Sequence, residues 1–239
     1  MSRHAALTSD EHRDLRVRTE SSAELGDAVS ACFTVPSEFR RLQHRFPILF
    51  RRDEASGKFS ALALLGFENG ENLFLQEDRW DADYKPMALA IQPFLVGRSA
   101  SEGGDSQVHV DLDHPRICAG SDGTPVFDNH GRPTPYLEQA MAMLEELDQG
   151  YRSSDSFFAA LERYKLLEPF FLDVELNNGS KHRMVGYQLI NEETLQELEP
   201  GAVAELHAEG HLMPIFMALA SLSSLGDLIA RKNRRNADG

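Results

Sequence analysis

The residues of this chain with the clearest capacity for chemistry lie at positions 109–114, which read His-Val-Asp-Leu-Asp-His. On a β-strand alternate side chains project from one face, so His109, Asp111 and Asp113 would lie together. A His-x-Asp pair on a strand, joined by a distant histidine, is the ligand pattern of non-haem Fe(II) sites. The candidates for the third ligand are His182, His207 and His211. The competing interpretation of His109 and Asp111 is a solvated strand end, where Asp113 and Pro115 open a turn.

A second candidate site combines two aromatic side chains with a guanidinium and a carboxylate. These residues are Arg79, Trp80, Asp83 and Tyr84. Such a set could line a pocket for an indole or a peptide. In the alternative interpretation Trp80 and Tyr84 cover a hairpin and Arg79 pairs with Asp83. Aromatic side chains supply core area more often than ligand contacts, so the sequence favours the structural role.

The known catalytic motifs are missing from the sequence. Cys32 and Cys118 have neither a metal-type spacing nor the density of a disulfide framework, so we expect free thiols. The chain contains no Gly-x-Ser-x-Gly elbow, no Walker-type loop and no Gly-x-Gly-x-x-Gly fingerprint. We therefore expect no cofactor, and the sequence favours a non-catalytic protein over an enzyme.

The composition is that of a soluble globular protein with an acidic excess. The 239 residues include 38 acidic and 24 basic side chains, which give a formal net charge of −14. This field repels a phosphate backbone, so we expect no nucleic-acid partner. The first residues are rich in charge and contain no apolar run of the secretory type. We therefore expect the protein to reside in the cytoplasm.

The first half of the chain has strand and turn patterns. The apolar run Phe59–Phe67, the Asn69-Gly70 turn and the run Leu73–Leu75 predict a β-hairpin, because both turn residues tolerate positive φ. Phe46–Phe50 predicts a further strand of the same meander. Leu15–Thr19 alternates like a short edge strand.

The second half has helical patterns around one hairpin. Thr134 and Pro135 predict the start of a helix, followed by a second helix over 155–165 with its cap at Ser153 or Ser154. Asn178-Gly179 predicts a β-hairpin, and Asn191 is expected to cap a short helix.

The whole pattern predicts an α+β fold. We expect mostly antiparallel β-meander and hairpins in the N-terminal half, and helices plus one β-hairpin in the C-terminal half. We predict a single domain over 1–239, with possible lobes at 15–133, rich in strands, and 134–232, rich in helices.

The C-terminal segment 212–230 has the length of a membrane span, and the basic run 231–235 follows it. Asp227 would then lie in the hydrocarbon, and Pro214 and three serines dilute the apolar character. Because a charge inside a span is costly, the sequence favours a largely buried terminal helix over a tail anchor.

Short motifs follow one another in a characteristic order along nearly the whole chain. In the first half they are Phe46-Pro47-Ile48, Ala63-Leu64-Leu65-Gly66, Gly70-Glu71-Asn72-Leu73-Phe74, Arg79-Trp80 with Tyr84 and Pro86, and Pro93-Phe94. In the second half they are Gly123-Thr124-Pro125-Val126-Phe127, Gly131-Arg132-Pro133-Thr134-Pro135, Gly186-Tyr187 before Asn191-Glu192-Glu193-Thr194-Leu195, and Gly210-His211-Leu212-Met213-Pro214-Ile215 before Ala220-Ser221-Leu222. With these motifs the chain resembles the SapC family of bacterial proteins.

The resemblance implies partners rather than a reaction, since no catalytic residues come with the family. Relatives are often encoded near TonB-dependent receptors and flavin-dependent tryptophan-halogenase-like proteins. The resemblance therefore suggests a protein partner from an uptake system or an oxidoreductase of that kind.

We accordingly expect a non-catalytic binding or accessory protein of the SapC type, which works with a protein partner and could also form a homo-oligomer. Two alternatives stay open. The first is a metal-dependent enzyme of the non-haem iron type acting on a peptide or amino acid, with His109 and Asp111 as ligands. The second is a peripheral membrane protein held by its C-terminal helix.

Overall fold

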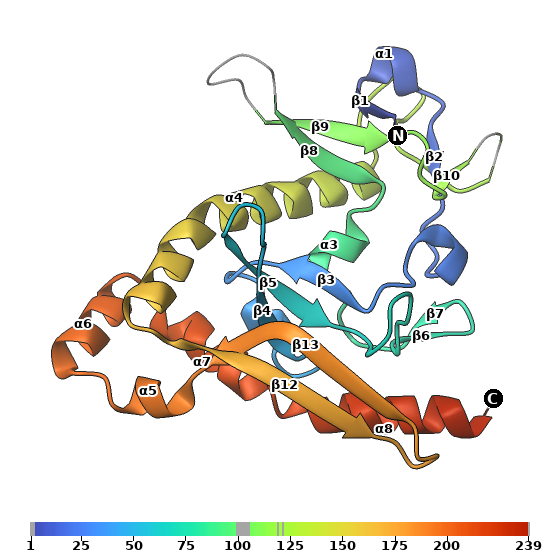
Figure 1. Ribbon diagram of the computed structural model, residues 1–239. Coiled ribbons are helices and arrows are strands. Elements are labelled where there is room, and N and C mark those ends of the chain that lie inside the picture. The colour runs from blue at the N-terminus through green and yellow to red at the C-terminus, as the bar shows by residue number, and fades with distance from the viewer. Residues whose placement is uncertain (1–2, 99–105, 119, 121, 239) are drawn as a thin grey trace. The chain divides into compact units, whose positions relative to one another are not determined.

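The computed structural model describes residues 3–98, 106–118, 120 and 122–238, and Figure 1 shows its ribbon. Helices and antiparallel sheets are both present, which confirms the predicted α+β class. The chain forms two compact units, and each is built from more than one segment. The first unit contains Met1–Ala28, Leu75–Asp81 and Met87–Gln149, and the second contains Val29–Phe74, Ala82–Pro86 and Gly150–Gly239.

The first unit contains two three-stranded antiparallel sheets and a two-stranded ribbon. One sheet has the order β1-β9-β8, from His4–Ala6, Ser106–Asp111 and Phe94–Arg98. The other has the order β10-β2-β11, from Ile117–Cys118, Arg16–Val17 and Thr124–Pro125, and the ribbon pairs β6 (Leu75–Gln76) with β7 (Arg79–Trp80). The short helices are α1 (Ser9–His12), a 3-10 turn at Ala23–Leu25, and α3 (Met87–Ala90).

The position of β2 differs from the prediction for Leu15–Thr19. We expected an edge strand, but β2 is the central strand of its sheet. Val17 lies opposite both Ile117 and Thr124, and its side chain is fully buried. The short alternating pattern did not reveal that two later segments would pair with this strand.

The second unit is built on a five-stranded antiparallel sheet with the order β12-β13-β4-β5-β3. These strands are Leu167–Glu175, Lys181–Ile190, Ile48–Arg52, Phe59–Leu64 and Ala31–Thr34. Its helices are α2 (Phe39–Leu42), α5 (Glu192–Gln196), α6 (Pro200–Ala208), α7 (Leu212–Ser221) and α8 (Ser224–Asp238). Fully buried aromatic rings, including Phe39, Phe50 and Phe157, fill its core.

The hairpin predicted at Asn69-Gly70 is wrong. Strand β5 pairs with β3 on one edge and β4 on the other, so no edge remains for the run Leu73–Leu75. Gly70 does adopt the positive φ of 78° that a turn requires. After this turn the N–H of Leu73 donates to the carbonyl oxygen of Leu65 at 2.8 Å, but the run Leu73–Leu75 does not pair with β5 as a strand.

The predicted break between two helices near residue 154 is also wrong. Helix α4 is continuous over Pro135–Arg163, 29 residues that begin in the first unit and end in the second. The hydroxyls of Ser153 and Ser154 donate to the carbonyl oxygen of Gly150, at 3.1 and 2.6 Å. Serine side chains can bond back to a preceding turn within a helix, and here they do so instead of capping a new one.

The hairpin predicted at Asn178-Gly179 is confirmed, as are the Asn191 cap of α5 and the helix over Pro200–Ala208. Phe170 pairs with Tyr187, but Leu172, two residues further on β12, pairs with Met184, three residues away on β13. The extra residue on β13 forms a bulge. Gly186, with φ of 82°, lies in that bulge, where a residue without Cβ is favoured.

Candidate functional site

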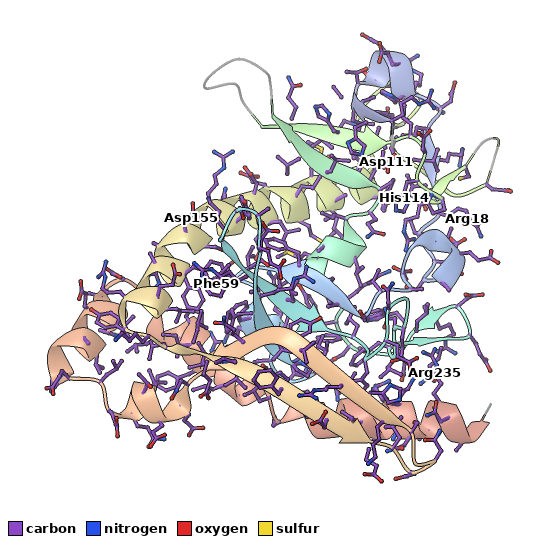
Figure 2. The ribbon with its side chains drawn as sticks, in the orientation of Figure 1. Arg18, Phe59, Asp111, His114, Asp155 and Arg235 are labelled. Carbon is purple, nitrogen blue, oxygen red and sulfur yellow. The ribbon has the colours of Figure 1, made fainter. Side chains whose placement is uncertain are left out.

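Both predicted metal ligands lie on β9, in the first unit. The ring of His109 lies against β8, where a Cβ atom at Gly97 would overlap it. Asp111 lies opposite His4 on β1, and its Oδ2 is 3.9 Å from the Nε2 of that histidine. Figure 2 labels Asp111 near His114, whose N–H donates to the Asp111 carbonyl oxygen at 3.2 Å.

The candidates for a third metal ligand lie in the second unit. His182 has its Nδ1 3.0 Å from Oε1 of Glu68, and the ring of His211 packs edge-on against Phe157. Among the residues that the structure describes, no group of three His, Cys, Asp or Glu side chains is placed to hold a metal ion. The metal hypothesis thus rests on the sequence pattern alone.

The second predicted cluster is divided between the two units. Arg79 and Trp80 lie on β7 in the first unit, and Asp83 and Tyr84 lie in the second. Asp83 accepts hydrogen bonds from His44 Nε2 at 3.0 Å and from Arg45 Nε at 3.2 Å. These bonds lower the pKa of Asp83, and its ion pair is with Arg45 rather than Arg79.

Tyr84 holds its segment against α2 through a buried carboxylate. Its hydroxyl donates to Oε1 of Glu38 at 2.8 Å, and Thr34 donates to Oε2 of the same residue at 2.7 Å. The guanidinium of Arg41 lies 5.6 Å from the centre of the Tyr84 ring. Asp83 and Tyr84 therefore make structural contacts, but with His44, Arg45 and Glu38, and the expected pairing of Arg79 with Asp83 is wrong.

Both cysteines lack the features of a reactive thiol. Cys32 is buried, and burial together with the charge of Glu38 raises its pKa. The pKa of Cys118 is also raised, mainly by burial. A thiol reacts as the thiolate, so neither environment favours nucleophilic chemistry.

A buried ion pair organises the loop around Arg116 in the first unit. Its Nη2 lies 2.7 Å from Oδ2 of Asp27, and both side chains are almost fully buried. Its Nη1 donates to the carbonyl oxygens of Arg18 and Glu20, both at 2.8 Å. Burial and the charge of Arg116 lower the pKa of His114, which favours its neutral form. The arrangement ties three chain segments together, at 18–20, at Asp27 and at 114–116.

The first unit contains an open pocket with a volume of about 730 Å³. One wall comes from the segment around β2, with Arg13, Asp14 and Arg16, and the other from Pro125 and Phe127 in the turns that follow. The Gly123–Phe127 and Gly131–Pro135 motifs, which carry part of the family resemblance, build that second wall. The sequence did not reveal this pocket, because no local motif unites its walls.

Helix α7 in the second unit is apolar on two faces. Ile215 and Ala218 are buried, and the helix packs against α2, β4 and β13. The opposite stripe contains Met213, Phe216, Met217 and Ala220, at the i, i+3, i+4, i+7 spacing of a single helix face. Met213 and Phe216 are 55% and 52% exposed. We call these four residues the α7 stripe.

The C-terminal segment differs from the single, largely buried helix that we expected. It forms α7 and α8, separated at Leu222 and Ser223. By length and composition Leu212–Ala237 could cross a membrane, but only 28% of its most apolar part is buried. The prediction of burial was wrong because one face of α7, with Met213 and Phe216, is exposed to solvent.

The basic residues after α7 bind the loop that follows β5. The Nζ of Lys232 lies 2.6 Å from Oε1 of Glu71 and 3.3 Å from Oε2 of Glu68. The guanidinium of Arg231 lies 4.5 Å from the centre of the Phe74 ring, and Arg235 donates to the carbonyl oxygen of Asn72 at 3.0 Å. Much of the basic run is thus engaged within the unit.

These features define an α+β protein with an open pocket in one unit and an exposed apolar helix face in the other. Residues 7–228 match the SapC family, and the chain therefore belongs to that family. The resemblance inferred from the short motifs is confirmed. No curated protein and no solved structure shows significant similarity to the chain.

Proposed function

We propose that this SapC-family protein is a non-catalytic, cytoplasmic accessory protein that docks on a protein partner through the α7 stripe. The observation that carries the proposal is the exposure of Met213 and Phe216 on a helix whose other face is already buried. A helix that is apolar all round is normally covered on all sides.

Covering the stripe would yield substantial binding energy. Fully burying a large apolar side chain is worth about 1.5–3 kcal/mol. About half of the surface of Met213 and of Phe216 is exposed and could be buried by a partner. Val203 on α6, a helix that contacts α7, is 37% exposed as well. Large aromatic and methionine side chains are also enriched in interface cores.

The charges that precede the stripe in the sequence indicate the kind of partner. Between residues 191 and 211 the chain has six glutamates and no lysine or arginine. They are Glu192, Glu193, Glu197, Glu199, Glu205 and Glu209, of which Glu205 already pairs with Arg163 at 2.9 Å. A partner should therefore offer an apolar groove with a basic rim, since complementary charges set orientation and speed association. Within the classes that the family resemblance suggests, we propose a flavin-dependent halogenase-like oxidoreductase as the partner.

Titration of the protein with a purified halogenase-like oxidoreductase from the same organism tests the proposal. We expect Phe216→Glu to weaken binding by at least about tenfold, as for a central interface residue. Phe171→Glu is the matched control, because Phe171 is 63% exposed on β12. Equal binding by the two variants, or no binding by the unaltered protein, would count against the proposal.

A second candidate function is peripheral membrane binding, which the hydropathy of Leu212–Ala237 favours. The acidic residues before α7 and the internal contacts of Lys232 and Arg235 oppose adsorption to anionic lipid. Sedimentation with anionic vesicles at low salt separates the two candidates. Protein that stays in the supernatant supports the protein partner, and protein that pellets unless Phe216 is replaced by glutamate supports the membrane.

A further inference from the structure

We propose that the pocket in the first unit binds a small organic monocarboxylate, with the carboxylate at Arg13 and Arg16 and the apolar part on Pro125 and Phe127. This site is separate from the α7 stripe, and nothing in the proposed function depends on it. The pocket volume of about 730 Å³ lies within the range of small-molecule sites.

Arg13 supplies a guanidinium with free donors. It makes no hydrogen bond or ion pair with any residue in the described part of the chain. Its Nη2 approaches the turn at Gly131, where an added Cβ would lie 3.2 Å from it. The guanidinium therefore lies against the turn that forms the far wall. Such a planar fork matches a carboxylate in two-point contact.

Arg16 supplies a second guanidinium that the fold fixes in position. Its Nη1 donates to the carbonyl oxygen of Gly123 at 2.9 Å, across 107 residues of chain. Arg16 also lies opposite both Cys118 and Pro125 in its sheet. One donor is thus used structurally, and the remaining N–H groups have no other partner among the described residues.

The two carboxylates at the pocket differ in their availability. Asp128 accepts from the backbone N–H of Arg132 at 2.9 Å and from its Nε at 2.8 Å, and also from the N–H of His130. These bonds lower the pKa of Asp128 to about 2 and satisfy its charge within the turn. Asp128 is therefore no competitor for Arg13 and Arg16.

Asp14 makes no such contact with a described residue, and its side chain is exposed. A free carboxylate at the rim repels a second negative charge on the ligand. The pocket should therefore select a monoanion over a dianion. Phe127, which is only 8% exposed, and Pro125 give the bound molecule an apolar wall.

Titrations of the full chain, monitored by amide chemical shifts, test this site. The probes are benzoate, uncharged benzamide, and the dianions phthalate and phenyl phosphate. We expect benzoate to give saturable shifts at residues of the pocket, with at least about fivefold weaker binding of the other three probes, since charge pairing and repulsion decide the difference. Phenyl phosphate that binds more tightly than benzoate would overturn the assignment of a monocarboxylate.

Three variants complete the test. Arg13→Gln should weaken the binding of benzoate at least about tenfold. Arg18→Gln, an exposed control that also removes one positive charge, should leave the affinity for benzoate unchanged. Asp14→Asn should reduce the preference for benzoate over phthalate. The absence of saturable shifts at the pocket, or unaltered binding by Arg13→Gln, would overturn the proposal.

Discussion

The Nζ of Lys232, near the C-terminus, lies 2.6 Å from Oε1 of Glu71, although 161 residues separate them in the chain. The two side chains are only 6% and 9% exposed. Glu71 also accepts a hydrogen bond from the N–H of Phe67 at 2.9 Å, so it fixes its own loop as well as α8. The Gly70–Phe74 motif is thus the docking point of the C-terminal helix.

Replacing Lys232 by methionine should lower the free energy of unfolding by about 3 kcal/mol, because Glu71 would remain as a buried charge without its cationic partner. Urea denaturation followed by circular dichroism measures the change. Arg234→Met is the control, since Arg234 is exposed on the same helix. Two equal effects would show that the contact with Glu71 adds nothing.

The same ion pair predicts a dependence on alkaline pH. Burial disfavours the charged form of Lys232, but the hydrogen bonds and charges of Glu71 and Glu68 raise its pKa above 10.5. A raised pKa means that the stabilisation is fully present below the unfolded-state pKa and is lost as the pH rises through the folded-state pKa. The stability difference between the protein and Lys232→Met should hold from neutral pH to about pH 10 and shrink above it. A difference that grows above pH 10 would contradict this.

The two faces of α7 should respond differently to truncation. Ile215→Ala should cost about 2–4 kcal/mol, because it leaves a cavity at a fully buried position. Phe216→Ala should cost about 1 kcal/mol or less, since half of that side chain is already in solvent. Chemical denaturation of both variants checks the contrast. A large loss from Phe216→Ala would mean that the stripe belongs to the core.

The contact between Tyr84 and Glu38 predicts a structural role for this tyrosine. Tyr84→Phe removes a donor to a buried carboxylate and should cost about 2 kcal/mol. Tyr151→Phe is the control, because Tyr151 is 49% exposed. Unchanged stability of Tyr84→Phe would favour the alternative in which the residue serves a ligand.

Local signals predicted the elements that depend on local contacts. Asn191 accepts from the N–H of Thr194 at 2.8 Å, and this cap could be recognised from neighbouring residues alone. The turn at Asn178-Gly179 also pairs two strands that adjoin it in sequence. Such features need no knowledge of the remaining chain.

Distant partners decided the features that the sequence did not reveal. The turn at Gly70 is present, but β3 and β4 already occupy both edges of β5. The pocket joins Arg16 to Gly123, and no pattern within a short window reports such a pairing. The stripe on α7 could have been found, since Met213, Phe216 and Met217 follow helical spacing beside the buried face. Its exposure required the packing of the second unit.

Site-specific photocrosslinking in living cells tests the central claim most directly. A photoreactive phenylalanine analogue at position 216 should give one discrete adduct with the halogenase-like oxidoreductase, and Met213→Glu should abolish it. The same analogue at position 171, which is also exposed, should give none. Adducts of equal yield at positions 171 and 216, or an adduct at 216 with lipid alone, would contradict partner docking through α7.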